Sequence, residues 1–373
     1  MTPQQRERWV GLMGARTGWW ELCAEAALEP DWEIVDPHFH FWIEHEVADP
    51  ADPTRKLRTS RYLADEFLRD VQSGHRLTDF VYIECGSGYQ TDGPDHLRPV
   101  GEINFALELA KSLGDGSDRP RLGAISAHAD LAHAELDAIL DLYVDTGGGL
   151  VRSIRHSAAR LENPAARLLA GAARPGIYAD PAFRRGVARL GERGLAFEAF
   201  QFHLQLHELV ALVRETPGTT FIVNHLGTPI GYGRGQEADE AVFDEWARGI
   251  DALAGFNNII MKLGGMASPV TEYDAASRPR PPSSEEFVRE RGRYFLYAVH
   301  ALGAERCMFE SNFPVDSVSL SFTTLWNAYK IMAGYYSARE RQSLLSETAR
   351  RIYQLDAAQA SYLPRPSFSA AGH

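Results

Sequence analysis

The sequence predicts an α/β fold, and within that class a single-domain (β/α)8 (TIM) barrel. Three observations predict it: eight short apolar runs recur along the chain, amphipathic segments lie between them, and polar side chains gather where nearly every run ends. Continuous apolar runs are typical of strands buried on both faces in a parallel sheet. Alternation of such strands with helices over this length favours a barrel. A doubly wound open sheet is the alternative, but no GxGxxG loop follows the first run.

The runs define the expected strands in order. They are 34–42, 80–86, 121–129, 150–156, 195–203, 220–227, 258–265 and 307–315. Intervening segments such as "HLQLHELVALVRETPG" and "AVFDEWARGIDALAG" have helical periodicity and close on a glycine, a signal that ends helices. We therefore expect an N-terminal helical extension over 1–33, the barrel over 34–360, and a C-terminal tail over 361–373.

Composition and net charge argue against some classes of binding partner. The 373 residues carry a formal net charge of −12, which argues against a nucleic-acid or anionic membrane surface as the main partner. No stretch approaches the 18 or so apolar residues that a membrane span requires. The three cysteines are widely spaced and form no CxxC, as expected for reduced thiols. We expect a cytoplasmic protein that acts on a small molecule.

The first run, "IVDPHFHFW", carries His38 and His40 one residue apart. Side chains alternate along a strand, so positions i and i+2 point to the same face. Two imidazoles on one face can reach one point, and a metal ion is its simplest occupant. The alternative is a pair of core or surface histidines with backbone partners.

The other runs also end in polar or titratable residues. These are Glu84, His128, Arg155, His156, His203, Asn224, His225, Lys262, Glu310 and Asn312. Burial of unpaired polar groups is costly, so scattered core residues would not gather in this way. Barrel chemistry sits at the carboxyl ends of the strands. The pattern therefore predicts one active site built from several strand ends.

With these motifs, the chain resembles the amidohydrolase superfamily. The resemblance extends from about residue 34 to residue 355 and rests on "DPHFHFW", "YIECG", "IRHSAA", "NHLG", "KLGG" and "CMFESNFPVDSVSL". The branch it looks like, amidohydrolase 2, includes 2-pyrone-4,6-dicarboxylate lactonase and aminocarboxymuconate semialdehyde decarboxylase.

The resemblance implies a set of site residues. His38, His40 and His203 match the family's histidine ligands to a divalent metal. His225 matches the histidine that polarises or protonates the substrate carbonyl. Three neutral imidazoles with an open position suit Zn²⁺ best.

The departure from the family pattern is at strand eight, where Asn312 stands in place of the usual aspartate. An amide cannot take a proton from water, so the general base must lie elsewhere or the metal must be absent, as in metal-free lactonases of the family. Asp316 and Glu84 are the candidate bases, with Asp316 favoured. Glu310 is expected to pair with an arginine inside the barrel.

Three further residues are candidates for substrate binding. Arg155 offers a planar fork that matches a carboxylate, although a salt bridge to Glu198 or another carboxylate is an equal alternative. His128 ends the third run, where packing or a backbone hydrogen bond is the alternative role. Arg61 belongs to a basic stretch after the first strand that is suited to gather anions, or to form a solvated surface.

We expect a hydrolase of an ester, lactone or amide bond in a small, carboxylated ring compound. A non-oxidative decarboxylase of an aromatic or muconate-type acid is the second hypothesis. A small-molecule binder that has lost its base is the third. A homodimer is expected from the family alone.

Overall fold

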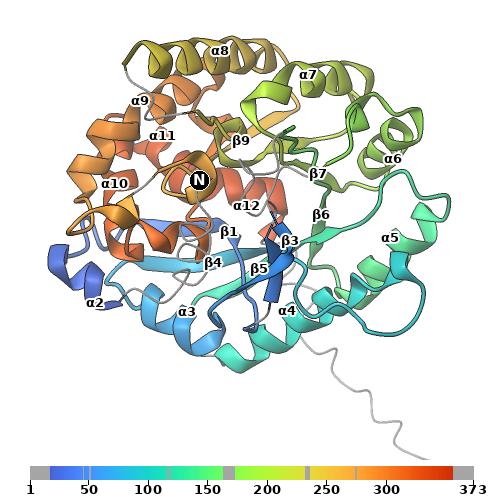
Figure 1. Cartoon of the computed structure of the whole chain (residues 1–373), viewed down its shortest axis with the longest axis horizontal. Helices are drawn as coiled ribbons and strands as arrows, with labels where there is room; N and C mark the ends of the chain where they lie inside the picture. The colour runs from blue at the N-terminus through green and yellow to red at the C-terminus, as the bar shows by residue number, and fades with distance from the viewer. Residues whose placement is uncertain are drawn as a thin grey trace, which may run out of the picture.

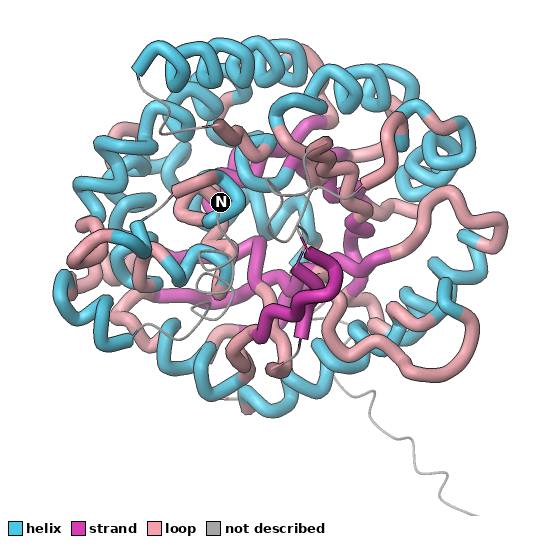
Figure 2. The backbone as a smooth tube through the Cα atoms, in the orientation of Figure 1, coloured by secondary structure: helices cyan, strands magenta, loops and turns pink. Residues whose placement is uncertain are grey.

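The strands form a central barrel and the helices surround it (Figures 1 and 2). This computed structural model describes residues 17–44, 46–49, 52–114, 116, 119–162, 173–231, 236–273 and 275–355. The first sixteen residues of the predicted extension and the predicted tail over 361–373 lie outside the described residues.

Eight parallel strands make the barrel, and each of the eight predicted runs overlaps one of them, so the predicted fold is confirmed. In chain and sheet order they are β1 (Glu33–Phe39), β4 (Arg76–Ile83), β5 (Arg121–His128), β6 (Val151–Arg155), β7 (Ala196–Ala199), β8 (Phe221–Val223), β9 (Ile259–Leu263) and β10 (Cys307–Phe309). Their side chains are almost entirely buried, as expected for strands covered on both faces.

The segment after β10 closes the barrel against β1. The backbone N–H of Asn312 donates to the His38 carbonyl at 3.1 Å, and the backbone N–H of His40 donates to the Phe313 carbonyl at 2.8 Å. This closure brings the end of the last strand beside the histidines of the first, although the two are more than 270 residues apart in sequence.

Helices follow the strands and pack apolar faces onto them. They are α2 (Thr17–Trp20), α3 (Ala64–Val71), α4 (Val100–Leu113), α5 (Leu136–Thr146), α6 (Pro181–Glu192), α7 (Leu206–Glu215), α8 (Gln236–Ala254), α9 (Ser284–Leu302), α10 (Phe322–Ala333), α11 (Ala338–Gln342) and α12 (Thr348–Tyr353). None of the described helices is both long enough and apolar enough to cross a membrane.

Two additions decorate the barrel. An antiparallel hairpin, β2 (Glu46–Asp49) with β3 (Asp52–Arg58), occupies the long connection after β1. The described part of the N-terminal extension packs on the outside, where the Trp20 indole N–H donates to the Ser317 carbonyl at 3.0 Å. The extension is thereby tied to the segment that follows β10.

Candidate active site

A cavity of about 340 Å³ opens where the strands end, at the face expected for barrel chemistry. Its lining combines polar groups with apolar walls, which is the usual make-up of a small-molecule site. The lining residues are His40, Trp42, Thr59, Glu84, Cys85, Arg155, Ser157, Phe200, His225, Thr228, Gly265, Ser268, Val270, Thr271, Asn312 and Val315.

His38 of β1 and His40, directly after this strand, converge as the alternation predicts. Their Nε2 atoms lie 3.0 Å apart. The other ring nitrogen of His40, Nδ1, lies 2.8 Å from the Ile83 carbonyl. A carbonyl only accepts, so His40 Nδ1 carries the proton and its Nε2 presents a lone pair.

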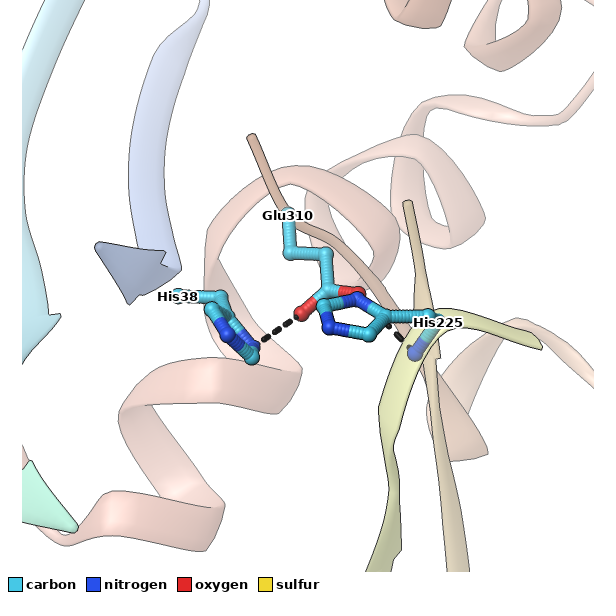
Figure 3. Close-up of side chains that lie close together, drawn as sticks. All are labelled: His38, His225 and Glu310. Carbon is cyan, nitrogen blue, oxygen red and sulfur yellow. Dashed lines mark hydrogen bonds and ion pairs between the residues drawn. The ribbon is translucent and has the colours of Figure 1, made fainter. Parts of the chain in front are cut away.

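Glu310 lies between His38 of β1 and His225, which follows β8 in the short helix η6 (Asn224–Gly227), as Figure 3 shows. One carboxylate oxygen lies 2.7 Å from His38 Nδ1, and the other lies 2.6 Å from His225 Nδ1. The second oxygen also accepts the backbone N–H of His225 at 3.1 Å. The expectation that Glu310 pairs with an arginine is therefore wrong: its partners are the two imidazoles.

The backbone around His225 adopts an unusual conformation. His225, Leu226 and Thr228 all have φ near +50°, a region that residues with side chains rarely occupy. The His225 ring packs against Gly265, where an added Cβ would lie 2.6 Å from the ring. Such strain clusters at functional sites and persists because surrounding structure enforces it.

Burial keeps His38 and His40 neutral. Loss of solvation lowers the pKa of His38 and of His40 well below the usual value, and neighbouring cationic groups lower it further. Neutral imidazoles are the form that binds metal ions.

The donor set fits a divalent cation. His38 Nδ1 lies between the Glu310 carboxylate at 2.7 Å and the Lys262 ammonium at 3.3 Å, and His40 Nε2 presents its lone pair to His38 Nε2 at 3.0 Å. This contact is repulsive unless a cation or proton lies between them. Carboxylates that orient metal-binding histidines in this way are common around metal centres. Among the described residues, His38, His225 and Glu310 also bring ligand atoms within 4.8 Å of one another.

His203 lies outside this cluster, contrary to its expected place beside His38 and His40. Strand β7 ends at Ala199, and His203 begins the short helix η5 (His203–Gln205). Its Nδ1 accepts the Ile230 N–H at 3.3 Å, and its Nε2 lies 4.0 Å from Glu245. The predicted run extended the strand too far, and the imidazole lies between the Ile230 backbone and Glu245 of α8.

Asp316 does not reach the cavity, contrary to its expected role over the barrel mouth. It lies in η10 (Val315–Val318) and is fully buried. Its two oxygens accept the Asn312 Nδ2–H at 2.7 Å and the Ala267 N–H at 3.1 Å. Burial raises the pKa of Asp316 well above its usual range. Asn312 itself lines the cavity, with φ of 55°.

Glu84 and Arg155 both line the cavity, and they are paired with each other. Arg155 Nε donates to Glu84 Oε1 at 2.7 Å, and a second guanidinium N–H donates to the Glu84 backbone carbonyl. Both side chains are largely buried. The alternative of a salt bridge at Arg155 is thus the one observed, with Glu84 in place of Glu198.

The other two candidate substrate contacts lie away from the cavity lining. His128 Nδ1 donates to the Arg155 carbonyl at 3.1 Å, which is the backbone role given above as its alternative. Arg61 is exposed and pairs with Glu66 at 2.7 Å.

Sequence reasoning missed a second polar cluster inside the barrel. Lys262 Nζ donates to Glu198 at 2.9 Å and lies 3.3 Å from His38 Nδ1. Glu198 also accepts hydrogen bonds from Ser153, Asn224 and the Tyr353 hydroxyl. The sequence did contain a signal for this cluster, because the otherwise apolar strands β7 and β9 each carry one charged residue. Charged side chains are almost never fully buried unless they are paired, so these two charges could have been expected to pair.

Histidines and carboxylates from several strand ends gather around one cavity, an arrangement typical of barrel enzymes. A family model described as Amidohydrolase matches residues 151–355, more than half of the chain, and the chain belongs to this family.

Similar proteins extend over nearly the whole barrel. The protein y4mH of Sinorhizobium fredii is 26% identical over 334 residues, covering 87% of this chain and 99% of that protein. The L-fucono-1,5-lactonase of Burkholderia multivorans is 24% identical, covering 86% and 96%. An amidohydrolase structure from Burkholderia multivorans with bound zinc has a TM-score of 0.65 at 21% identity, covering 86% and 99%. This last likeness supports the fold.

Proposed function

We propose that this amidohydrolase cleaves the ester bond of a lactone in a small ring compound. The carrying observation is the contact of His225 with Glu310, 2.6 Å between Nδ1 and the carboxylate, with the same imidazole on the cavity wall. The similarity to a lactonase over nearly the full barrel supports this reaction class.

His225 acts as the proton carrier in this proposal. Because Glu310 holds the Nδ1 proton, His225 Nε2 presents a lone pair to the cavity. It takes a proton from water as the water oxygen bonds to the lactone carbonyl carbon. The ring C–O bond then breaks, and the imidazolium returns that proton to the departing alkoxide, giving a hydroxy acid. Glu310 stabilises the imidazolium between these steps, as the carboxylate does in a Ser-His-Asp triad.

His38 and His40 would hold a divalent metal through their Nε2 atoms. When bound, the metal would polarise the substrate carbonyl as a Lewis acid. His40 Nδ1 stays fixed on Ile83, and His38 Nδ1 stays fixed on Glu310, so both ligand nitrogens keep their direction.

The test is hydrolysis of a panel of lactones by the purified full chain, followed by acid release at constant pH. We expect at least one lactone to be hydrolysed, and His225→Asn to lower kcat by roughly 10²-fold or more. His300→Asn, an exposed histidine near the end of α9, is the control and should match the wild type. Carbon dioxide release from aromatic acids, with every lactone untouched, would favour a decarboxylase and reject the proposal.

A further inference from the structure

The cavity contains its own ion pair. Among the described residues that line the cavity, Arg155 and Glu84 are the ones of the Lys, Arg, Asp and Glu types. Their side chains are 8% and 15% exposed, and their charges meet at 2.7 Å. To a molecule in the cavity, the guanidinium charge is therefore largely cancelled by the carboxylate beside it.

The pair is also fixed in place. Arg155 is bound to both the side chain and the backbone carbonyl of Glu84, and its guanidinium carbon lies 5.7 Å from the centre of the Phe200 ring. A substrate carboxylate that approached Arg155 would lose solvent and would meet the negative charge of Glu84 at short range. Like charges placed together in this way select against the wrong ligand.

The remaining polar groups of the cavity suit an uncharged ring. Thr228 Oγ1 is buried without a hydrogen-bond partner among the described residues, so it can serve a ligand. Asn312 donates one Nδ2–H to Asp316, which leaves the amide oxygen as an acceptor and the second Nδ2–H as a donor. Trp42, Phe200 and Val270 add apolar wall.

We propose that Glu84 is a specificity-determining residue which, by neutralising Arg155, makes the cavity select uncharged ring lactones over carboxylated ones. This inference rests on the proposed function, from which it takes the lactone as the reacting group. It replaces the carboxylated substrate expected from the sequence. Removal of the Glu84 charge exposes the Arg155 charge and turns the same cavity towards carboxylated rings.

The test compares 2-pyrone-6-carboxamide with 2-pyrone-6-carboxylate, a pair that differs by one negative charge. Binding to the wild-type chain is measured by calorimetry in the presence of chelator, because a divalent ion held by His38 and His40 would add its own positive charge to the cavity and attract the carboxylate. We expect the carboxamide to bind at least about tenfold more tightly. Tighter or equal binding of the carboxylate, or binding of neither compound, overturns the inference.

The variant Glu84→Gln tests the cause, because glutamine keeps an acceptor for Arg155 Nε and removes the charge. We expect the preference for the carboxamide to fall by at least about tenfold. Glu240→Gln, which breaks an exposed pair with Arg293 on the outer helices, is the matched control and should keep the wild-type preference. An unchanged preference in a folded Glu84→Gln protein overturns the assignment.

The wild-type comparison does not depend on any variant, so a Glu84→Gln chain that fails to fold leaves the inference open to refutation. The two proposals also fail in different ways. A chain that hydrolyses no lactone but binds the carboxamide preferentially contradicts the proposed reaction alone. A chain that hydrolyses carboxylated lactones best contradicts the charge preference alone.

Discussion

Glu198 and Glu310 are both carboxylates buried in this barrel, and their surroundings differ. Glu198 of β7 faces the ammonium of Lys262 at 2.9 Å and is hydrogen-bonded to Ser153, Asn224 and Tyr353. Glu310, after β10, faces two imidazoles and a backbone N–H.

The difference separates a structural carboxylate from one that acts in the site. A full positive charge compensates Glu198, and its neighbours occupy both oxygens, so its charge is neutralised locally. Glu310 has partners whose own charge depends on protonation. Its carboxylate contacts Nδ1 of both rings, and through His225 it is linked to the cavity wall.

The largest expected effect tests the role of Glu310. Glu310→Gln keeps the size of the side chain but removes the charge that stabilises the His225 imidazolium. We expect kcat for lactone hydrolysis to fall by roughly 10²–10⁴-fold with the fold retained, measured by acid release and circular dichroism. A decrease of less than tenfold would make Glu310 a structural residue like Glu198.

The next effect concerns stability. Lys262→Met leaves Glu198 buried without its counter-ion, and we expect the free energy of unfolding to fall by about 3–5 kcal/mol in urea titrations. Lys56→Met, which breaks an exposed pair with Glu46, should change it by less than about 1 kcal/mol. Equal losses in the two variants would contradict the contrast between buried and exposed pairs.

Measurements of metal affinity test which histidines are ligands. His40→Ala removes an Nε2 that faces the proposed ion, and we expect zinc affinity to fall more than about 100-fold in chelator competition. His203→Ala should lower it by less than about tenfold, because the imidazole is directed at Ile230 and Glu245. The reverse order would restore His203 to the ligand set.

Another buried carboxylate, Glu102 of α4, has no hydrogen bond to a cationic side chain among the described residues and gives the smallest effect. One oxygen accepts from the Tyr82 hydroxyl and the Cys85 and Ser87 amides, and the other is buried without a partner among the described residues. Burial, with the neighbouring Glu84 charge, raises the pKa of Glu102 to about 7.

Because that pKa lies above the unfolded value, the protonated form favours folding. This contribution is full below the unfolded pKa of about 4.5 and is lost as pH rises through about 7. The stability of the wild type relative to Glu102→Gln should therefore fall by about 2 kcal/mol between pH 5 and pH 8. A difference that does not change with pH in denaturant titrations would show that Glu102 is ionised throughout.

The fold could be predicted from the sequence because each strand is a continuous apolar run that needs two covering layers. The convergence of His38 and His40 followed from alternation alone. The partners of the polar residues could not be predicted in the same way, because they depend on where each strand stops. Strand β7 ends at Ala199, four residues before the end of the predicted run, and His203 therefore lies outside the cluster. Asp316 is buried because it lies in the short helix after β10.

Pairing across the barrel was the other limit. Glu84 and Arg155 are 71 residues apart, and Glu310 and His225 are 85 apart. Each of these charged residues has several candidate partners in the list of strand ends. Only the register of the closed barrel decides among them, and a single sequence does not contain that register explicitly.

The phenol of Tyr353 has a consequence for the order of synthesis. It reaches from α12, near the end of the described chain, to Glu198 of β7, made about 150 residues earlier. A nascent chain in which all eight strands have been synthesised still lacks this hydrogen-bond donor. We expect nascent chains halted before α12 to be far more sensitive to protease than chains released after it, and equal sensitivity would contradict this dependence.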